Sequence, residues 1–129
     1  MSTDLEKALA NDLVIDITTT GRTSGAPRTV EIWFHRIDGR YYITGWPGRR
    51  AWYANLLEDP RFVITFTRSS NLALAAVAHP ITEPALRRRI IDAVIEIEGG
   101  RAHGEIGEWV ESSPIIEFVA ADGVEREED

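Results

Sequence analysis

The chain has no cysteine and very little lysine, because Lys7 stands alone against thirteen arginines. Without cysteine there can be no disulfide, no thiolate metal ligand and no cysteine nucleophile. No apolar run approaches the roughly 18 residues that a transmembrane helix needs, so no membrane partner is expected. Residues 1–7 also lack the basic start and the apolar core of a secretion signal, and we therefore expect a cytoplasmic protein.

Several motifs of common enzymes are missing as well. The histidines His35, His79 and His103 are widely spaced and form neither H-x-x-x-H nor H-E-x-x-H, so no metal site is predicted. No G-x-S-x-G nucleophile elbow of a serine hydrolase occurs. The pair Gly21 and Gly25 lacks the third glycine of a dinucleotide fingerprint and the Gly-Lys-Ser/Thr of a P-loop. Nucleotide hydrolysis is therefore not expected.

The composition is that of one globular domain. The chain has 129 residues, of which 43% are hydrophobic and 27% charged, and this suits a single core. We predict one domain over residues 1–129, with an N-terminal segment at 1–10. The acidic tail at 122–129 is expected to be disordered.

The charge is unevenly distributed along the chain. The net charge is −7, yet residues 20–53 hold six arginines against two acids, and residues 83–129 hold thirteen acids against five arginines. An acidic chain with a local basic region argues against general nucleic-acid binding and is compatible with a small anionic ligand. Alternatively, these arginines lie separately on solvent-facing strand positions.

The hydrophobic pattern predicts mainly β-structure. Alternating apolar residues indicate six strands, over residues 13–19, 29–37, 40–46, 61–68, 72–79 and 114–120. Asp38-Gly39 is a strong hairpin signal between two of them. In the second strand, Glu31, Trp33 and His35 share one face, which we interpret as a solvent-facing or dimer-facing surface.

Two helices are predicted between the strands. One covers 51–58 and is ended by Pro60. The other begins at Thr82-Glu83-Pro84, where the threonine hydroxyl is the expected cap, and runs to about Glu98. The arginines at 87–89 are interpreted as a solvated face of this helix. Strands in this order favour an α+β protein, mainly β, with a small antiparallel barrel, although pattern alone leaves other α+β sheets open.

The loop between the first two strands contains glycines, hydroxyl side chains and arginines, which together can hold an anion. Thr20, Gly21, Ser24 and Gly25 are candidate backbone and hydroxyl donors. The candidate phosphate partners are Arg22 and Arg28. An ordinary hairpin connection would use the same residue types.

A resemblance to a known family sharpens this interpretation. The loop reads T-T-G-R-x-S-G-x-P-R from residue 19 to residue 28, and Trp52-x-x-Asn55-Leu56 and Asp59-Pro60 follow. The chain thereby resembles the deazaflavin-dependent nitroreductases, which are similar to the pyridoxamine-phosphate-oxidase-like split β-barrel proteins. The resemblance implies a six-stranded antiparallel split barrel of the FMN-binding type. By analogy with this fold it also implies a homodimer.

The resemblance further implies an oxidoreductase. A reduced 8-hydroxy-5-deazaflavin coenzyme (F-420 type) would supply a hydride to a quinone, a nitroaromatic compound or an activated alkene. The resemblance places Trp46, Trp52 and Asn55 near the coenzyme, with buried core packing as the alternative role of the two tryptophans. Arg49 and Arg50 are expected to contact its phosphate or its acidic oligoglutamate tail. No catalytic acid is predicted, because the coenzyme performs the difficult chemistry.

The chain departs from the family in its loop. Thr23 and Ala26 stand where the family usually has lysine, so two positive charges are missing. FMN carries a single phosphate and needs fewer positive charges, and it is therefore the alternative cofactor. The remaining alternative is a protein that binds a flavin-like or tetrapyrrole ligand without turnover.

Overall fold

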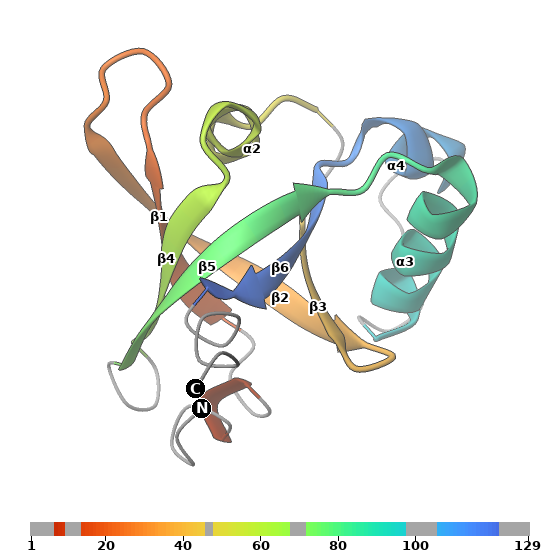
Figure 1. Ribbon diagram of the computed structural model, residues 1–129. Coiled ribbons are helices and arrows are strands. Elements are labelled where there is room, and N and C mark those ends of the chain that lie inside the picture. Colours follow the sequence, from red (N-terminus) through yellow and green to blue (C-terminus); the bar gives the residue numbers. More distant parts are fainter. Residues whose placement is uncertain (1–6, 10–13, 46–47, 68–71, 98–105, 122–129) are drawn as a thin grey trace.

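The computed structural model shows a closed six-stranded antiparallel barrel with helices attached to it (Figure 1). It describes residues 7–9, 14–45, 48–67, 72–97 and 106–121. The strand order around the barrel is β1-β2-β3-β6-β5-β4. The strands are β1 (Val14–Thr20), β2 (Pro27–Ile37), β3 (Arg40–Thr44), β4 (Arg61–Phe66), β5 (Leu72–Pro80) and β6 (Ile115–Ala120). The predicted mainly-β barrel is confirmed.

Strand β1 closes the barrel because it pairs with a neighbour on each side. Ile17 lies opposite Val30 of β2 and also opposite Ile64 of β4. Ile15, Ile17 and Thr19 are buried. This period of two is the alternation that the sequence shows, with every second side chain pointing into the barrel.

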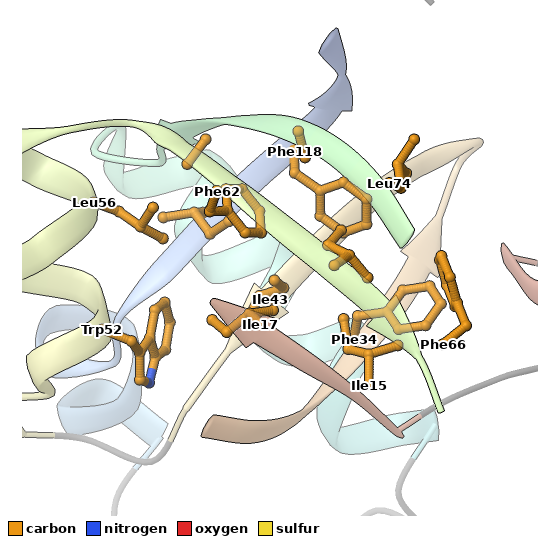
Figure 2. Close-up of a cluster of buried hydrophobic side chains, with 14 of the residues drawn as sticks. Ile15, Ile17, Phe34, Ile43, Trp52, Leu56, Phe62, Phe66, Leu74 and Phe118 are labelled. Atoms are coloured by element: carbon orange, nitrogen blue, oxygen red, sulfur yellow. The ribbon is translucent and has the colours of Figure 1, made fainter. Parts of the chain in front are cut away.

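The barrel interior is filled by aromatic and branched side chains (Figure 2). Phe118 of β6 lies at its centre, with its ring centroid 6.0 Å from that of Phe34 and 6.2 Å from that of Phe62. Both pairs meet edge to face, which is a favoured geometry for aromatic rings. Trp52 and Leu56 of helix α2 (Ala51–Glu58) belong to the same core, so this helix is fixed against one end of the barrel.

A second hydrophobic core lies outside the barrel, beneath helices α3 (Pro84–Ile97) and α4 (Ile106–Ser112). Ile90, Ile91 and Val94 of α3 pack there with Trp109 of α4 and with Tyr42 of β3. The predicted apolar stripe of the long helix is thus confirmed. Burial, the largest effect, raises the pKa of the Tyr42 phenol.

The structure corrects several local predictions about helices α3 and α4. Helix α4 was not predicted at all. The cap of α3 is Glu83, not Thr82, because the Glu83 carboxylate accepts hydrogen bonds from the amides of Ala85 and Leu86. The arginines at 87–89 are not one solvated face, since Arg87 donates to three backbone carbonyl oxygens.

The solvent-facing interpretation of His35 is also wrong. Its side chain points out of the barrel but is only 3% exposed, because α3 covers part of β2. Asp38 and Gly39 both have positive φ, as a tight hairpin turn requires, and the predicted β2–β3 hairpin is confirmed. The tail at 122–129, most of the segment at 1–10 and Trp46 lie outside the described residues.

Candidate functional site

A groove lies between the β1–β2 hairpin and helix α2, at the end of the barrel that the hairpin extends beyond (Figure 1). Its volume is ≈ 670 Å³, which is within the usual range for a cofactor site. The lining residues come from β1, the hairpin loop, β2 and α2. They are Thr19, Gly21, Arg22, Thr23, Ser24, Pro27, Arg28, Thr29, Val30, Ala51, Trp52 and Asn55.

Internal hydrogen bonds hold the hairpin loop in one shape. The Gly21 amide donates to the Ala26 carbonyl at 2.8 Å, and the Gly25 amide donates to the Gly21 carbonyl at 2.8 Å. The Ala26 amide donates to the Ser24 hydroxyl at 3.1 Å. A Cβ atom on Gly21 would lie 2.9 Å from that hydroxyl oxygen and 3.1 Å from the Ala26 carbonyl oxygen, so a larger residue here would have to displace the Ser24 side chain. The two glycine amides serve the loop itself and are not available to an anion.

Two other loop amides remain for a ligand. Within the described residues, the amides of Thr23 and Ser24 have no intrachain acceptor. Both residues line the groove, and Ser24 also keeps a hydroxyl proton while its oxygen accepts from Ala26. The open donors of the loop therefore lie at its tip, at Thr23 and Ser24; Ser24 was among the predicted donors and Thr23 was not.

Asn55 ties the loop to helix α2. Its side chain is 3% exposed, and its Nδ2 donates to the Thr19 hydroxyl at 3.0 Å. Its Oδ1 accepts from the Arg22 amide at 3.1 Å and from the Arg22 Nη1 at 3.3 Å. All of these bonds are internal, so Asn55 shapes the groove by positioning Arg22 and Thr19.

The arginines of residues 20–53 divide into three groups. Arg22 and Arg28 line the groove, and Arg28 has no carboxylate partner among the described residues. Arg36, near the far end of β2, and Arg40, the first residue of β3, lie at the opposite end of the barrel. There the Arg36 guanidinium is 5.8 Å from the Tyr41 ring centroid, and Arg40 pairs with Glu117 at 3.0 Å.

The third group, Arg49 and Arg50, precedes helix α2 and is not part of the groove lining. The Arg50 Nη1 donates to the Arg49 carbonyl at 2.8 Å, so this side chain folds back on its own loop. Arg50 is the N-cap residue of α2 but provides no side-chain cap. No described side chain caps the first amides of α2, and Ala51 and Trp52 of this turn line the groove. A helix start of this kind favours an anion.

The predicted site residues are thus partly brought together. Gly21, Arg22, Ser24, Arg28, Trp52 and Asn55 all line the groove. Thr20 lines a neighbouring hollow of ≈ 380 Å³, and Gly25 is an exposed glycine of the loop with a φ of 74°. Thr19 was not predicted, although it continues the inward-facing positions of Ile15 and Ile17 and could have been found from that period.

The neighbouring hollow shares Thr19 and Pro27 with the groove and lies on the other side of the hairpin. An ion pair stands on its wall, where Arg61 Nε lies 3.1 Å from Asp59 Oδ1. Hydrogen bonds from Arg61 lower the pKa of the Asp59 carboxyl. No group of metal-ligating side chains occurs in the described residues.

Comparison with known proteins identifies the family of this chain. A sequence profile of the F420H(2)-dependent quinone reductases matches residues 4–98, which is most of the chain. The chain belongs to this family. The protein is therefore an oxidoreductase of the deazaflavin-dependent kind, as the resemblance implied. No curated protein matches the sequence.

Solved structures confirm the fold of this reductase. A conserved hypothetical protein from Mycobacterium tuberculosis is 20% identical with a TM-score of 0.71, over 94% of this chain and 81% of that one. A putative pyridoxamine 5'-phosphate oxidase from Listeria innocua is 12% identical with a TM-score of 0.69, over 92% and 91%. A putative 5-nitroimidazole antibiotic resistance protein from Bacteroides thetaiotaomicron is 11% identical with a TM-score of 0.69, over 94% and 80%.

The family profile covers part of the chain. The profile match ends at residue 98, so α4 and β6 lie outside the matched residues. Among the helices of the described part of the chain, none is long and apolar enough to cross a membrane.

The role of Asn55 predicts a measurable loss of stability. Replacing Asn55 by Ala removes the partner of the Thr19 hydroxyl and of the Arg22 amide, which should lower the free energy of unfolding by about 1–3 kcal/mol. Urea denaturation measures this loss. The control is Leu57→Ala on the same helix, where the side chain is 56% exposed and the change should stay within about 0.5 kcal/mol. Equal losses for the two variants would contradict the role assigned to Asn55.

Proposed function

We propose that the protein transfers a hydride from a reduced 8-hydroxy-5-deazaflavin coenzyme to a quinone, and that the groove between the β1–β2 hairpin and α2 holds this coenzyme. The observation that carries the proposal is the convergence of Arg22, Arg28, two open loop amides and an uncapped helix start on one groove. When bound, the coenzyme supplies the hydride. Nitroaromatic compounds and activated alkenes are further acceptors in this proposal.

The residues of the groove fit a coenzyme with a phosphate at one end. Arg28 can grip two phosphate oxygens with its planar guanidinium, and Arg22 adds a second positive charge that Asn55 holds in place. The amides of Thr23 and Ser24, in the same hairpin, provide further donors of fixed direction. The coenzyme phosphate is therefore assigned to the hairpin side of the groove.

The other side of the groove suits a flat ring. Trp52 is 7% exposed and presents an apolar surface, and Val30 on the facing strand is 39% exposed. These side chains would orient the ring and keep water from one of its faces, which lets an acceptor approach the other face. Such a site requires no nucleophile from the protein, because the coenzyme carries the hydride. No catalytic acid was predicted from the sequence.

Arg28 provides the sharpest test of the coenzyme site. Fluorescence titration of the parent protein with the oxidised deazaflavin coenzyme should show binding, and oxidation of the reduced coenzyme by a quinone should show turnover. Arg28→Gln should lose about tenfold in affinity or more, because a charge-assisted hydrogen bond contributes about 1.5–3 kcal/mol. The matched control is Arg36→Gln, on the same strand at the far end of the barrel. A variant that binds as tightly as the parent but melts at a lower temperature would make Arg28 structural.

FMN is the alternative cofactor because Thr23 and Ala26 supply no positive charge to the loop. Thr23→Lys combined with Ala26→Lys should tighten binding of an oligoglutamylated deazaflavin more than binding of FMN, since added cations favour the more highly charged ligand. Titrations with both ligands measure the difference. The gain should fade with salt, because exposed charges are screened over about 10 Å at 0.1 M ionic strength. Equal gains for both ligands would show that these positions do not face the coenzyme tail.

We also propose that the protein forms a homodimer through the outer face of β1, β4 and β5. Thr18, Val63 and Ala75 form one row across these strands, and all three side chains are small. The described helices α3 and α4 pack over β3 and β6 and leave this row open (Figure 1). Val63 is 39% exposed and Trp33, on the outer side of β2, is 51% exposed.

Sedimentation at micromolar concentration tests the dimer. The parent should have twice the chain mass of 14.4 kDa, and Val63→Arg should be a monomer, because the charge would lack a partner at the centre of the interface. Leu57→Arg, at an exposed position of α2, is the control and should remain dimeric. A monomeric parent overturns the dimer and leaves the proposed coenzyme site unaffected.

A further inference from the structure

Arg87 of helix α3 makes three hydrogen bonds to backbone carbonyl oxygens in three different segments. Its Nε donates to Val110 at 2.7 Å, its Nη1 to Ile81 at 2.7 Å and its Nη2 to Ser113 at 2.6 Å. The guanidinium is planar and its donors have fixed directions, so one side chain sets the relative positions of these segments. Arg87 thereby joins the start of α3 to the end of α4.

The segment that Arg87 holds is the α4–β6 junction, Ser112–Pro114. Ser113 and Pro114 are buried, and the Ser113 amide donates to the Trp109 carbonyl at 3.0 Å as α4 ends. Within the junction the carbonyl groups point in two directions. Ser113 faces Arg87, whereas Ser112 and Pro114 face the described loop residues between β3 and α2, which are Gly45 and 48–50.

The junction in turn holds two of these loop residues, Gly45 and Gly48. The Gly45 amide donates to the Pro114 carbonyl at 3.2 Å, and the Gly48 amide donates to the Ser112 carbonyl at 3.2 Å. A Cβ atom on Gly45 would lie 3.1 Å from the Pro114 Cγ, so the loop and the junction are in close contact there. The loop leads directly into α2, whose first residues line the groove.

We propose that Arg87 is a positioning residue for the coenzyme groove, acting through the α4–β6 junction and loop residues 48–50 on the start of α2. The inference rests on the proposed function, because it assigns the groove to the coenzyme. Arg87 touches neither the groove nor the coenzyme. It fixes the wall that Ala51 and Trp52 form, and with it the distance between α2 and the arginines of the hairpin.

The neighbouring position gives a matched control. Arg88 is exposed, and among the described residues its side chain bonds only to Asp92, four residues along the same helix, at 3.2 Å. Arg88→Met removes the same charge and the same number of donors as Arg87→Met, from the same turn of α3. A difference between these two variants therefore reports the carbonyl bonds and not the loss of one positive charge.

The first measurement needs no coenzyme. Amide hydrogen exchange should show that Arg87→Met lowers the protection of the Gly45 and Gly48 amides by tenfold or more, while the Ala78 amide, which donates to Pro60 within the barrel, keeps its protection. Arg88→Met should leave all three unchanged. A uniform fall at all three amides would indicate global destabilisation and would overturn the positioning role.

The second measurement is coenzyme affinity, taken well below the melting temperature of each variant. Arg87→Met should raise the Kd for the oxidised deazaflavin coenzyme at least fivefold. Arg87→Lys should raise the Kd less, since a single ammonium can still donate to these carbonyls. Gly45→Ala should mimic the effect by pushing the loop from Pro114. The double variant Arg87→Met/Gly45→Ala should be no weaker than the worse single variant, because both changes break the same contact.

The outcomes separate this inference from the proposed function. If the parent protein does not bind the coenzyme, the proposed function fails, and the exchange data still decide whether Arg87 positions the loop. If the parent binds and Arg87→Met has a lower melting temperature with a Kd within twofold of the parent, the positioning role is overturned. Additive effects of Arg87→Met and Gly45→Ala on Kd would also overturn it.

Discussion

Pairing of β1 with both of its neighbours is the constraint on which the rest of the structure depends. The two partners, β2 and β4, are separated along the chain by β3 and α2, and the barrel closes only when β1 joins them. Closure buries Ile15 and Ile17 completely. It also fixes where β1 ends, so that Thr19 stands at the rim of the barrel and the hairpin beyond it extends over α2.

Asn55 sets the width of the groove at the end of this closed barrel. Its amide spans the gap between α2 and the hairpin and uses donor and acceptor together, with Thr19 on one side and Arg22 on the other. A buried amide that left either group without a partner would be costly, so the loop can take only the position that satisfies both. The conformation of Arg22 is thus a consequence of core packing, because α2 is itself fixed by Trp52 and Leu56.

Much of this architecture could be predicted because it follows from local periodicity. The strands alternate with a period of two, the helix at 51–58 is found within the predicted bounds, and Asp38-Gly39 specifies its hairpin. Helix α4 could not be predicted in this way. It has seven residues with Gly107 among them, and no separate apolar stripe stands out in a segment so short. Burial of Trp109 against α3 and β3 stabilises it, and that contact depends on the tertiary fold.

The same distinction explains what could not be predicted at the site and around it. Residue type correctly indicated that hydroxyl groups, glycines and arginines gather in the hairpin loop. It could not indicate that the Gly21 and Gly25 amides donate to carbonyl groups of the loop itself. Nor could it indicate that the Arg87 side chain turns away from solvent and donates to backbone carbonyl groups. His35 is a further case, since a strand position that alternation marks as exterior becomes interior once α3 covers β2.

The distribution of charge then has a structural explanation. The arginines of residues 20–53 appear in the sequence as one basic region, but the barrel sends Arg36 and Arg40 to one end and Arg22 and Arg28 to the other. At the first end the positive charge is used within the fold, against Tyr41 and Glu117. At the second end Asn55 holds Arg22 through an uncharged amide, and no carboxylate partner of Arg28 occurs in the described residues. An acidic chain therefore keeps a local positive field where the groove opens, and because the loop glycines are already bonded, the proposed coenzyme site depends on that field and on the start of α2.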